Sequence, residues 1–375
     1  MLEMLQIEFY KEWNRKYGEC KEEKMKIAMV PFGLSRKSIK KGEEVMRKVL
    51  FVLLFVVAAL VLVSGQSYAV SGQCGGCHTM HNSQNGTSMN YNGSGTPNAV
   101  LLRGDCLGCH AQNTASNGPS SANSIPPQVL HTNATDLAGG NFDNVVANMG
   151  RGHNVAGLTS ADTYNTAPGG TQTQQVTCAG GNGAVNTGCH GETTGAAGIS
   201  SNMMTAMAGS HHNNAGTNSQ LNVATTVANS YRFLLGVKGT EDTDWQHTVS
   251  ATDHNEYFSD NPDAAGFGIS KLCARCHTNF HDTAATQSAG EWIRHPTEIT
   301  IGATYATNYT ATYSPTVPVG RTAVAAVSGT VAATDTVVCM SCHVAHGSPY
   351  ADAIRWDYAN NVTGDGVGCN KCHAK

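Results

Sequence analysis

The sequence predicts a protein made mostly of loops, with short α-helices and minor β structure, whose core is filled by something other than its side chains. A chain of 375 residues would ordinarily bury a large apolar core. Only 7% of these residues are aromatic, whereas 41 are glycine and 13 are cysteine. So few large side chains cannot fill such a core, and the number of cysteines requires a chemical explanation.

The N-terminal 69 residues differ in composition from the rest of the chain. Residues 46–69 have the three parts of a signal peptide: a basic start, an apolar run over residues 49–63 and a small-x-small cleavage site at residues 67–69. The apolar run of 15 residues is shorter than the ~20 that a membrane-spanning helix needs. We interpret residues 1–45 as an upstream extension that is not translated, with Met46 as the start.

Cleavage after Ala69 leaves a mature chain, residues 70–375, with 12 cysteines. It keeps 11 basic and 19 acidic residues, a net charge of −8 with histidine neutral. This balance does not provide the basic patch that nucleic-acid binding requires. The signal peptide predicts passage through the periplasm to the cell surface or beyond, where cysteines meet oxidising conditions.

Five cysteine pairs share the pattern C-x-x-C-H, the attachment signature of c-type haem. Two thiols at this spacing reach the two vinyl groups on one porphyrin edge, and the adjacent histidine ligates the iron. Redox-active C-x-x-C pairs, structural zinc sites and disulfides give no reason for a histidine after every second cysteine. The first, second, fourth, fifth and sixth motifs along the chain are Cys74-Cys77-His78, Cys106-Cys109-His110, Cys273-Cys276-His277, Cys339-Cys342-His343 and Cys369-Cys372-His373.

The third motif departs from this spacing. Ten residues separate Cys178 from Cys189, and His190 follows directly. Four glycines make the insert flexible enough to loop out and bring the two thiols together. We interpret this motif as a sixth haem site, because His190 stands where a proximal ligand must stand. The alternative is a disulfide between Cys178 and Cys189.

Ten histidines remain beyond the six proximal ones, and six bis-histidine irons need six of them. A histidine three or four residues after a proximal one lies on the same side of a local helical turn. It cannot reach the opposite face of the same iron, so it must reach a neighbouring one. The distal candidates are His81, His281 and His346 in such doublets and His131, His153 and His295 in loops, with His211, His212 and His254 in reserve.

The predicted fold class is therefore a multihaem cytochrome c whose core is formed by stacked haems. Short helices should carry the C-x-x-C-H segments, and stretches rich in Gly, Ser, Asn and Pro, such as 82–98 and 113–127, should be loops. The motifs fall into three groups along the chain. Haem pairs that span these groups would join residues 70–375 into one domain.

Taken together, the motifs resemble those of the OmcS-type hexahaem cytochromes, which form conductive extracellular filaments in metal-reducing bacteria. The resemblance implies bis-histidine irons, a continuous chain of haems and one axial ligand donated to the next subunit by His81. The third motif differs, because the family has C-x-x-C-H followed by Asp-Pro-His. The matching segments are CGGCHTMHNSQNG, CLGCH, GHNVAG, SYRFLLG, CARCHTNFH, IRHP, CMSCHVAHGS and CNKCHAK.

We therefore expect an electron-transfer protein rather than an enzyme. The first hypothesis is a homopolymeric filament that delivers electrons to extracellular metal oxides or electrodes, with other c-type cytochromes as partners. The second is a monomeric periplasmic or surface carrier with the same six haems. The third, a multihaem reductase, would need an iron with an open coordination position, and the sequence has no C-x-x-C-K motif to signal one.

Overall fold

The computed structural model describes a discontinuous set of residues, all within the compact unit Ser67–Lys375. The signal peptide, the upstream extension, Cys74, Cys77, His81, His211 and His212 lie outside the described residues. The described residues are 78, 83–84, 87–88, 101–102, 106–112, 126–161, 163, 166–173, 175–179, 188–191, 207, 226–260, 267–281, 295–309, 312–323, 326–360 and 367–373.

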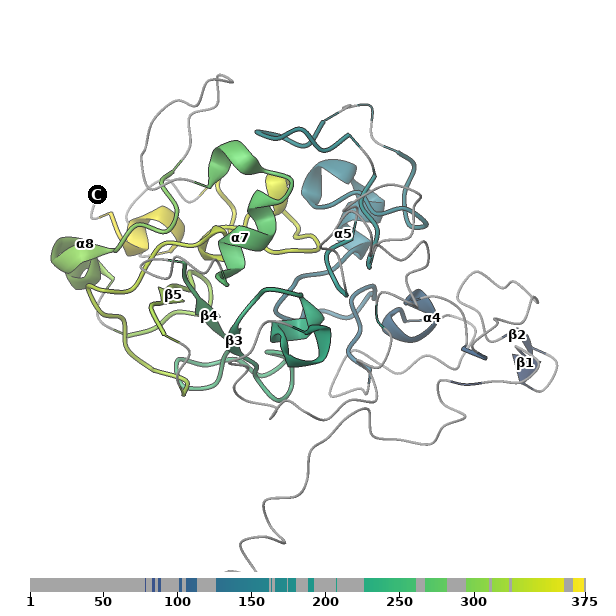
Figure 1. Cartoon of the computed structure of the whole chain (residues 1–375), viewed down its shortest axis with the longest axis horizontal. Helices are drawn as coiled ribbons and strands as arrows, with labels where there is room; N and C mark the ends of the chain where they lie inside the picture. The colour runs from purple at the N-terminus through teal and green to yellow at the C-terminus, as the bar shows by residue number, and fades with distance from the viewer. Residues whose placement is uncertain are drawn as a thin grey trace, which may run out of the picture. The chain divides into compact units, whose positions relative to one another are not determined.

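Irregular backbone dominates this part of the chain, as the sequence predicts, and its helices are one or two turns long (Figure 1). In the part that is described, no helix is both long and apolar enough to cross a membrane. The α-helices are α4 (Leu107–His110), α5 (Asp143–Ala147), α7 (Ile269–Ala274) and α8 (Gly302–Asn308). The 3₁₀-helices are η3 (Met149–Arg151), η5 (Val227–Asn229), η6 (Tyr231–Phe233), η7 (Thr278–Phe280), η8 (Cys339–Ser341), η9 (Ala351–Ala353) and η10 (Gly368–Lys371).

The β structure consists of two small sheets. β1 (Ser83–Gln84) pairs with β2 (Thr87–Ser88) in an antiparallel hairpin. The second sheet has the order β3 (Gly239–Thr240), β4 (Glu256–Phe258), β5 (Gly320–Arg321), with an antiparallel and then a parallel pairing. Every residue of β4 is buried. This short sheet holds together segments that are more than sixty residues apart in the sequence.

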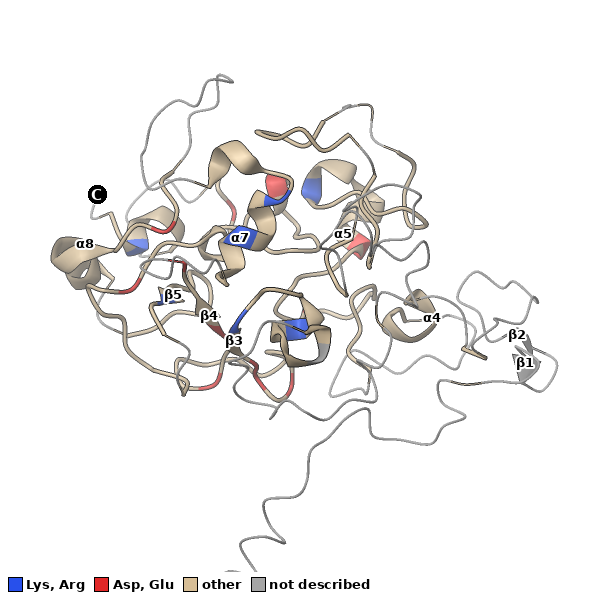
Figure 2. Ribbon diagram, viewed as in Figure 1, with Lys and Arg blue, Asp and Glu red and all other residues tan. Residues whose placement is uncertain are grey.

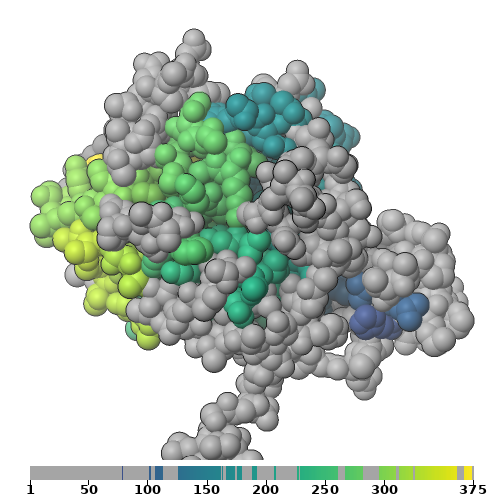
Figure 3. Space-filling view, viewed as in Figure 1, coloured from purple at the N-terminus to yellow at the C-terminus, as the bar shows by residue number. Residues whose placement is uncertain are grey.

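Three small apolar clusters take the place of one large core. One surrounds Tyr231, Tyr257 and Ile269, and Cys189 packs against it. The other two contain Tyr309 and Phe142 respectively. Cysteines of the fifth and sixth motifs pack against the second cluster, and a cysteine of the third motif packs against the third. In Figure 3 the C-terminal third of the chain and the segment around residues 130–160 lie on different sides of the drawn face.

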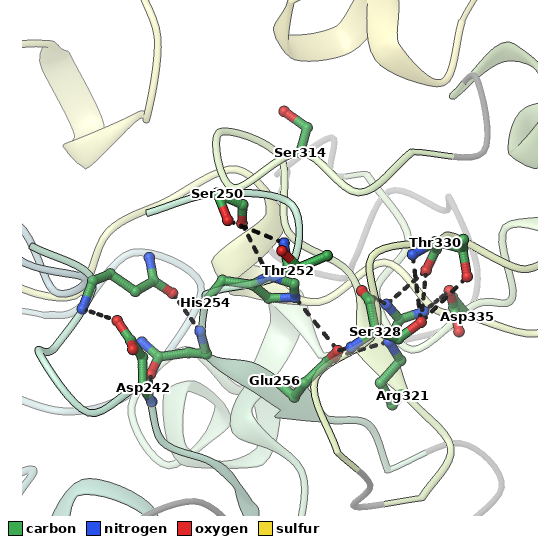
Figure 4. A network of polar contacts seen from close by, with 12 residues as sticks. Asp242, Ser250, Thr252, His254, Glu256, Ser314, Arg321, Ser328, Thr330 and Asp335 are labelled. Atoms are coloured by element: carbon green, nitrogen blue, oxygen red, sulfur yellow. Dashed lines mark hydrogen bonds and ion pairs between the residues drawn. The ribbon is translucent and has the colours of Figure 1, made fainter. Parts of the chain in front are cut away.

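Charged residues are dispersed along the described ribbon rather than gathered on one element (Figure 2). The main exception is a buried group around Arg321 on β5. Its Nε donates to Glu256 at 2.9 Å, its Nη1 pairs with Asp335, and its Nη2 donates to the carbonyl oxygens of Ser328 and Thr330 at 3.3 and 2.9 Å (Figure 4). One guanidinium thus joins β4, β5 and the loop that leads towards the fifth motif.

Candidate haem centres

Four C-x-x-C-H motifs fold into the same backbone turn. In the second, fourth, fifth and sixth motifs, the amide of the second cysteine donates to the carbonyl oxygen of the first at 3.1–3.3 Å. The amide of the following histidine donates to that same oxygen at 2.8–3.1 Å. These turns lie within or beside α4, α7, η8 and η10. Each turn therefore holds two thiols and one imidazole in a single compact unit.

The third motif closes in the same way despite its insert. The amides of Cys189 and His190 both donate to the carbonyl oxygen of Cys178, at 3.2 and 2.8 Å. Thr177 and Gly188 form a β-bridge that brings the two ends of the insert together. The third motif therefore presents the same set of side chains as the four regular ones.

Backbone carbonyl groups orient the proximal histidines. In four of them Nδ1 lies within hydrogen-bonding distance of a carbonyl oxygen, which can only accept, so Nδ1 carries the proton and Nε2 keeps its lone pair. This tautomer is the one that a metal ligand needs, and the hydrogen bond fixes the ring direction. The Nδ1–oxygen pairs are His110 with Pro127 (2.8 Å), His190 with Arg232 (3.0 Å), His277 with Pro168 (2.7 Å) and His343 with Asp352 (2.7 Å).

Three proximal histidines each have a second histidine at nearly the same distance between ring centroids. Two imidazoles that share one metal ion, with bonds of ~2 Å to each nitrogen, have ring centroids about 6 Å apart. Their planes are free to rotate about those bonds, so the angle between them does not matter. The observed centroid distances are 6.1 Å for His153 and His277, 6.2 Å for His190 and His346, and 6.1 Å for His295 and His373.

Burial favours the neutral form of several of these imidazoles. It lowers the pKa of His110, His153 and His343, and it lowers the pKa of His346 to about 3. The neighbouring His190 ring lowers the pKa of His346 further. An imidazole must be deprotonated at the ligating nitrogen to bind a metal. The protonation of these four imidazoles therefore suits a metal ligand.

Two further distal candidates lie beside carboxylates. His131 is buried, and its Nε2 lies 3.8 Å from Asp136 Oδ1 without forming a hydrogen bond. The Nε2 of His281 lies 3.3 Å from Asp260 Oδ2, and Glu298 completes this cluster. A buried polar atom without a hydrogen bond costs about 1–3 kcal/mol unless a ligand occupies it. His131 can therefore also serve as an iron ligand.

The reserve candidate His254 belongs to the polar network. Its ring is fully buried and stacks on Tyr313 at 3.6 Å. Its Nδ1 lies 3.1 Å from the carbonyl oxygen of Ser250, and its Nε2 lies 3.4 Å from Glu256 Oε1 (Figure 4). Both nitrogens of His254 thus face oxygen atoms of the protein in this arrangement.

Several residues that orient the candidate ligands were not predicted from the sequence. The ring of Phe142 stacks on His346 at 4.6 Å, and Tyr305 meets His373 edge-on at 5.0 Å. The carbonyl groups that accept from Nδ1 belong to four unrelated residues. Every residue has a carbonyl group, so no sequence signal could have identified them.

Consecutive motifs share apolar clusters. Met340 of the fifth motif belongs to the first cluster, against which Cys189 of the third motif and Leu272, next to the fourth, also pack. Cys342 of the fifth motif and Cys372 of the sixth both pack against the second cluster. Burial raises the pKa of the Cys189 thiol to about 11, with the Cys276 thiol as the next cause. A hydrogen bond between the Cys273 and Cys339 thiols raises the pKa of the first and lowers that of the second. Burial raises the pKa of the Cys342 thiol to about 12, with the Cys369 thiol of the sixth motif as the next cause. The third to sixth motifs thus form a row in chain order.

The second motif joins this row through its histidine. After burial and a backbone hydrogen bond, the His190 ring is the next influence on the pKa of His110. His346, opposite His190, is also close enough to His110 to be affected by it. Leu107 of the second motif also belongs to the third cluster, against which Cys178 packs, so each motif from the second to the sixth shares a cluster with the next.

Comparison with known proteins gives a limited result. No protein-family model matches the chain. No curated protein matches it. Two solved structures are similar to it.

The first is a cryo-EM structure of the OmcS nanowires from Geobacter sulfurreducens, with 23% identity and a TM-score of 0.42, covering 77% of this chain and 84% of that one. The second, the outer membrane cytochrome S filament from the same organism, has 22% identity and a TM-score of 0.44, covering 78% and 86%.

Proposed function

We propose that the mature chain holds six c-type haems in one row and carries electrons along it outside the cytoplasm, as an electron-transfer protein. The observation that carries this proposal is the packing of consecutive motifs against shared apolar clusters. Cysteines mark the edges at which porphyrins are attached, so motifs that pack against one cluster bring porphyrin edges near each other. Electron transfer between haems falls off steeply with the distance between such edges, and this row keeps that distance short.

The motifs assign the ligands of each haem. Both cysteines of each motif form the thioethers, and the histidine of that motif is the proximal ligand. From the centroid distances, His346 is the distal ligand in the third motif, His153 in the fourth and His295 in the sixth. His131 and His281 are distal candidates for the remaining haems, and His81 is the candidate that crosses between subunits.

The protein supplies position and environment. When bound, each haem supplies a one-electron iron couple. A proximal and a distal histidine would hold each iron and would leave no coordination position for a substrate, which favours electron transfer over catalysis. Hydrogen bonds from Nδ1 to carbonyl oxygens raise the basicity of the ligands and hold their rings. The apolar clusters beside the cysteines keep water from the attachment points.

One doublet supports the idea that neighbouring haems are tied together by the chain. His343 and His346 are three residues apart, yet the His346 ring lies opposite His190 of the third motif. A ligand that leaves the fifth motif and reaches the third cannot serve its own iron. The fifth motif thereby positions the distal ligand of the third.

The third motif gives a direct test of haem attachment. In Cys178→Ala we expect one of six haems to be held by a single thioether through Cys189, because the turn of the motif keeps His190 in place. Mass spectrometry of the denatured mature protein should find six haems in the wild type, with haem on the peptide that contains Cys189 in both proteins. Cys276→Ala, at a regular motif, is the matched control. A wild type with five haems and a Cys178–Cys189 disulfide would contradict the proposal.

The hypothesis that the protein polymerises into a filament is tested separately at His81. In His81→Met we expect all six haems to be attached but filaments to be lost or strongly shortened, because methionine changes the ligand at the subunit joint. Electron cryo-microscopy of protein from the cell surface measures filament length and shows whether haem density continues across the joint. Unchanged filaments would contradict the role of His81. Compact single particles in the wild type would favour a monomeric carrier.

A further inference from the structure

The two segments that carry His153 and His346 share one backbone ladder. The amide of His346 donates to the carbonyl oxygen of Gly139 at 2.7 Å, and the amide of His153 donates to the carbonyl oxygen of His346 at 3.0 Å. Gly347 forms a parallel bridge with Gly140 and an antiparallel bridge with Gly152. The segment around Gly347 therefore lies between two others. One contains Gly139 and Gly140 and lies against the His346 ring, and the other contains Gly152 and leads into His153.

Glycine is required at each contact of this ladder. A Cβ atom on Gly140 would lie 2.2 Å from the carbonyl oxygen of Gly347, and one on Gly152 would lie 2.2 Å from the carbonyl oxygen of His346. A Cβ atom on Gly347 would lie 2.5 Å from Val145 Cγ2. Gly140 also has a φ of +82°, which favours glycine. We call Gly140, Gly152 and Gly347 the glycine clamp.

Both histidine rings are held by residues of the segments that the clamp joins. Nδ1 of His153 lies 2.6 Å from the carbonyl oxygen of Ala345, so the ring is anchored to the segment that carries His346. The His346 ring lies between Phe142, which stacks on it, and Gly139, where a Cβ atom would lie 2.8 Å from Nδ1. A shift of the central segment would therefore move both rings.

The two rings point to different proximal histidines. His153 lies opposite His277 of the fourth motif, and His346 lies opposite His190 of the third. These two motifs are neighbours, since Cys189 of the third motif and Leu272, next to Cys273 of the fourth, pack against the same apolar cluster. One short piece of backbone thus reaches two consecutive centres.

We infer that the glycine clamp is a positioning element that sets the distal ligands of the third and fourth haems together, so that the two irons gain or lose these ligands as a pair. The inference rests on the proposed function, because it needs both histidines to be axial ligands. It predicts that a change at Gly347, which follows His346 in the chain but is no ligand itself, alters two haems and not one.

Gly347→Ala in the full mature cytochrome tests the inference. We expect two of the six haems to leave the bis-histidine low-spin state, measured by resonance Raman and electron paramagnetic resonance spectroscopy. Gly139→Ala is the matched contrast: within 4 Å the three nearest atoms to its added Cβ all belong to the His346 ring, so one haem should change. Gly150→Ala is the control, because the only close atom is Asn148 Oδ1 at 3.4 Å, and no haem should change.

A second variant covers the case in which Gly347→Ala does not accumulate. In Gly347→Ala with Val145→Ala, the closest clash is removed, and the Cβ atom then meets the carbonyl oxygens of Asn141 and Arg151 at 3.0 and 3.3 Å. We expect the same two haems to change to a smaller extent. A folded variant with one altered haem, or none, would overturn the coupling.

Failure of the proposed function gives a different pattern. If His153 and His346 are not axial ligands, their direct replacement leaves all six haems unchanged. If they are ligands but are not coupled, direct replacement alters one haem each, whereas Gly347→Ala does not alter a pair.

Discussion

In His346→Met we expect the reduction potential of one haem to rise by an amount on the order of 0.1 V, within the range of about 0.8 V over which axial ligands set haem potentials. Methionine stabilises ferrous iron more than imidazole does, so the potential rises. The haem concerned should be that of the third motif, because the His346 ring lies 6.2 Å from the His190 ring. Potentiometric titration with electron paramagnetic resonance detection of each low-spin signal measures the shift.

The location of that haem is tested by a double variant. His190→Met and His346→Met should affect the same iron, so the double variant should alter one haem, as each single variant does. Two altered haems in the double variant would contradict the pairing. His254→Met is the control, because His254 is buried but faces Glu256 and the carbonyl group of Ser250. Its replacement should leave all six potentials unchanged.

In Arg321→Met we expect the free energy of unfolding to fall by about 3–5 kcal/mol at pH 7, since removing one partner of a buried ion pair leaves uncompensated charge. Glu256 and Asp335 are 2% and 5% exposed and share this one guanidinium (Figure 4). Guanidinium denaturation followed by far-ultraviolet circular dichroism measures the loss. Arg151→Met, in an exposed 3₁₀-helix, is the matched control and should change stability by less than about 1 kcal/mol.

The same variant has a predicted pH dependence. In the wild type, burial would raise the pKa of Glu256, but the hydrogen bonds from His254 and Arg321 outweigh burial and hold it below its usual value. Burial already raises the pKa of Asp335. Without Arg321 both pKa values move up, so the native variant binds more protons than its unfolded chain, and its stability rises as the pH falls. The stability difference from the wild type should therefore shrink between pH 7 and pH 5. A constant difference would contradict this account of the network.

The resemblance in sequence pattern left open whether the long insert of the third motif disrupts the site. The tertiary structure closes the ends of the insert through the bridge between Thr177 and Gly188, and both amides return to the carbonyl oxygen of Cys178. The glycines of the insert predicted its flexibility, but flexibility alone does not decide where the two ends meet. The place where the two ends meet is fixed by the packing of Cys189 against the first apolar cluster and of Cys178 against the third.

The buried network around Arg321 has no counterpart in the sequence analysis. Glu256, Arg321 and Asp335 lie far apart in the chain and follow no periodic pattern, and a single charged residue is more often solvated than buried. His254 was a reserve ligand for the same reason: a histidine in a loop does not reveal which atoms will surround it. In the structure, the parallel pairing of β4 with β5 brings these side chains together.

The sequence by itself determined the local chemistry of this protein. Two cysteines and a histidine within five residues bring their own ligand geometry, and a composition rich in glycine and poor in aromatic residues already predicts loops and short helices. Only the tertiary structure decided which distal candidate lies near which proximal histidine, and which motifs pack against the same apolar cluster. Such contacts join residues as far apart as His153 and Ala345, 192 positions along the chain. A spacing rule cannot predict them, because they depend on how the loops pack and not on the residues between.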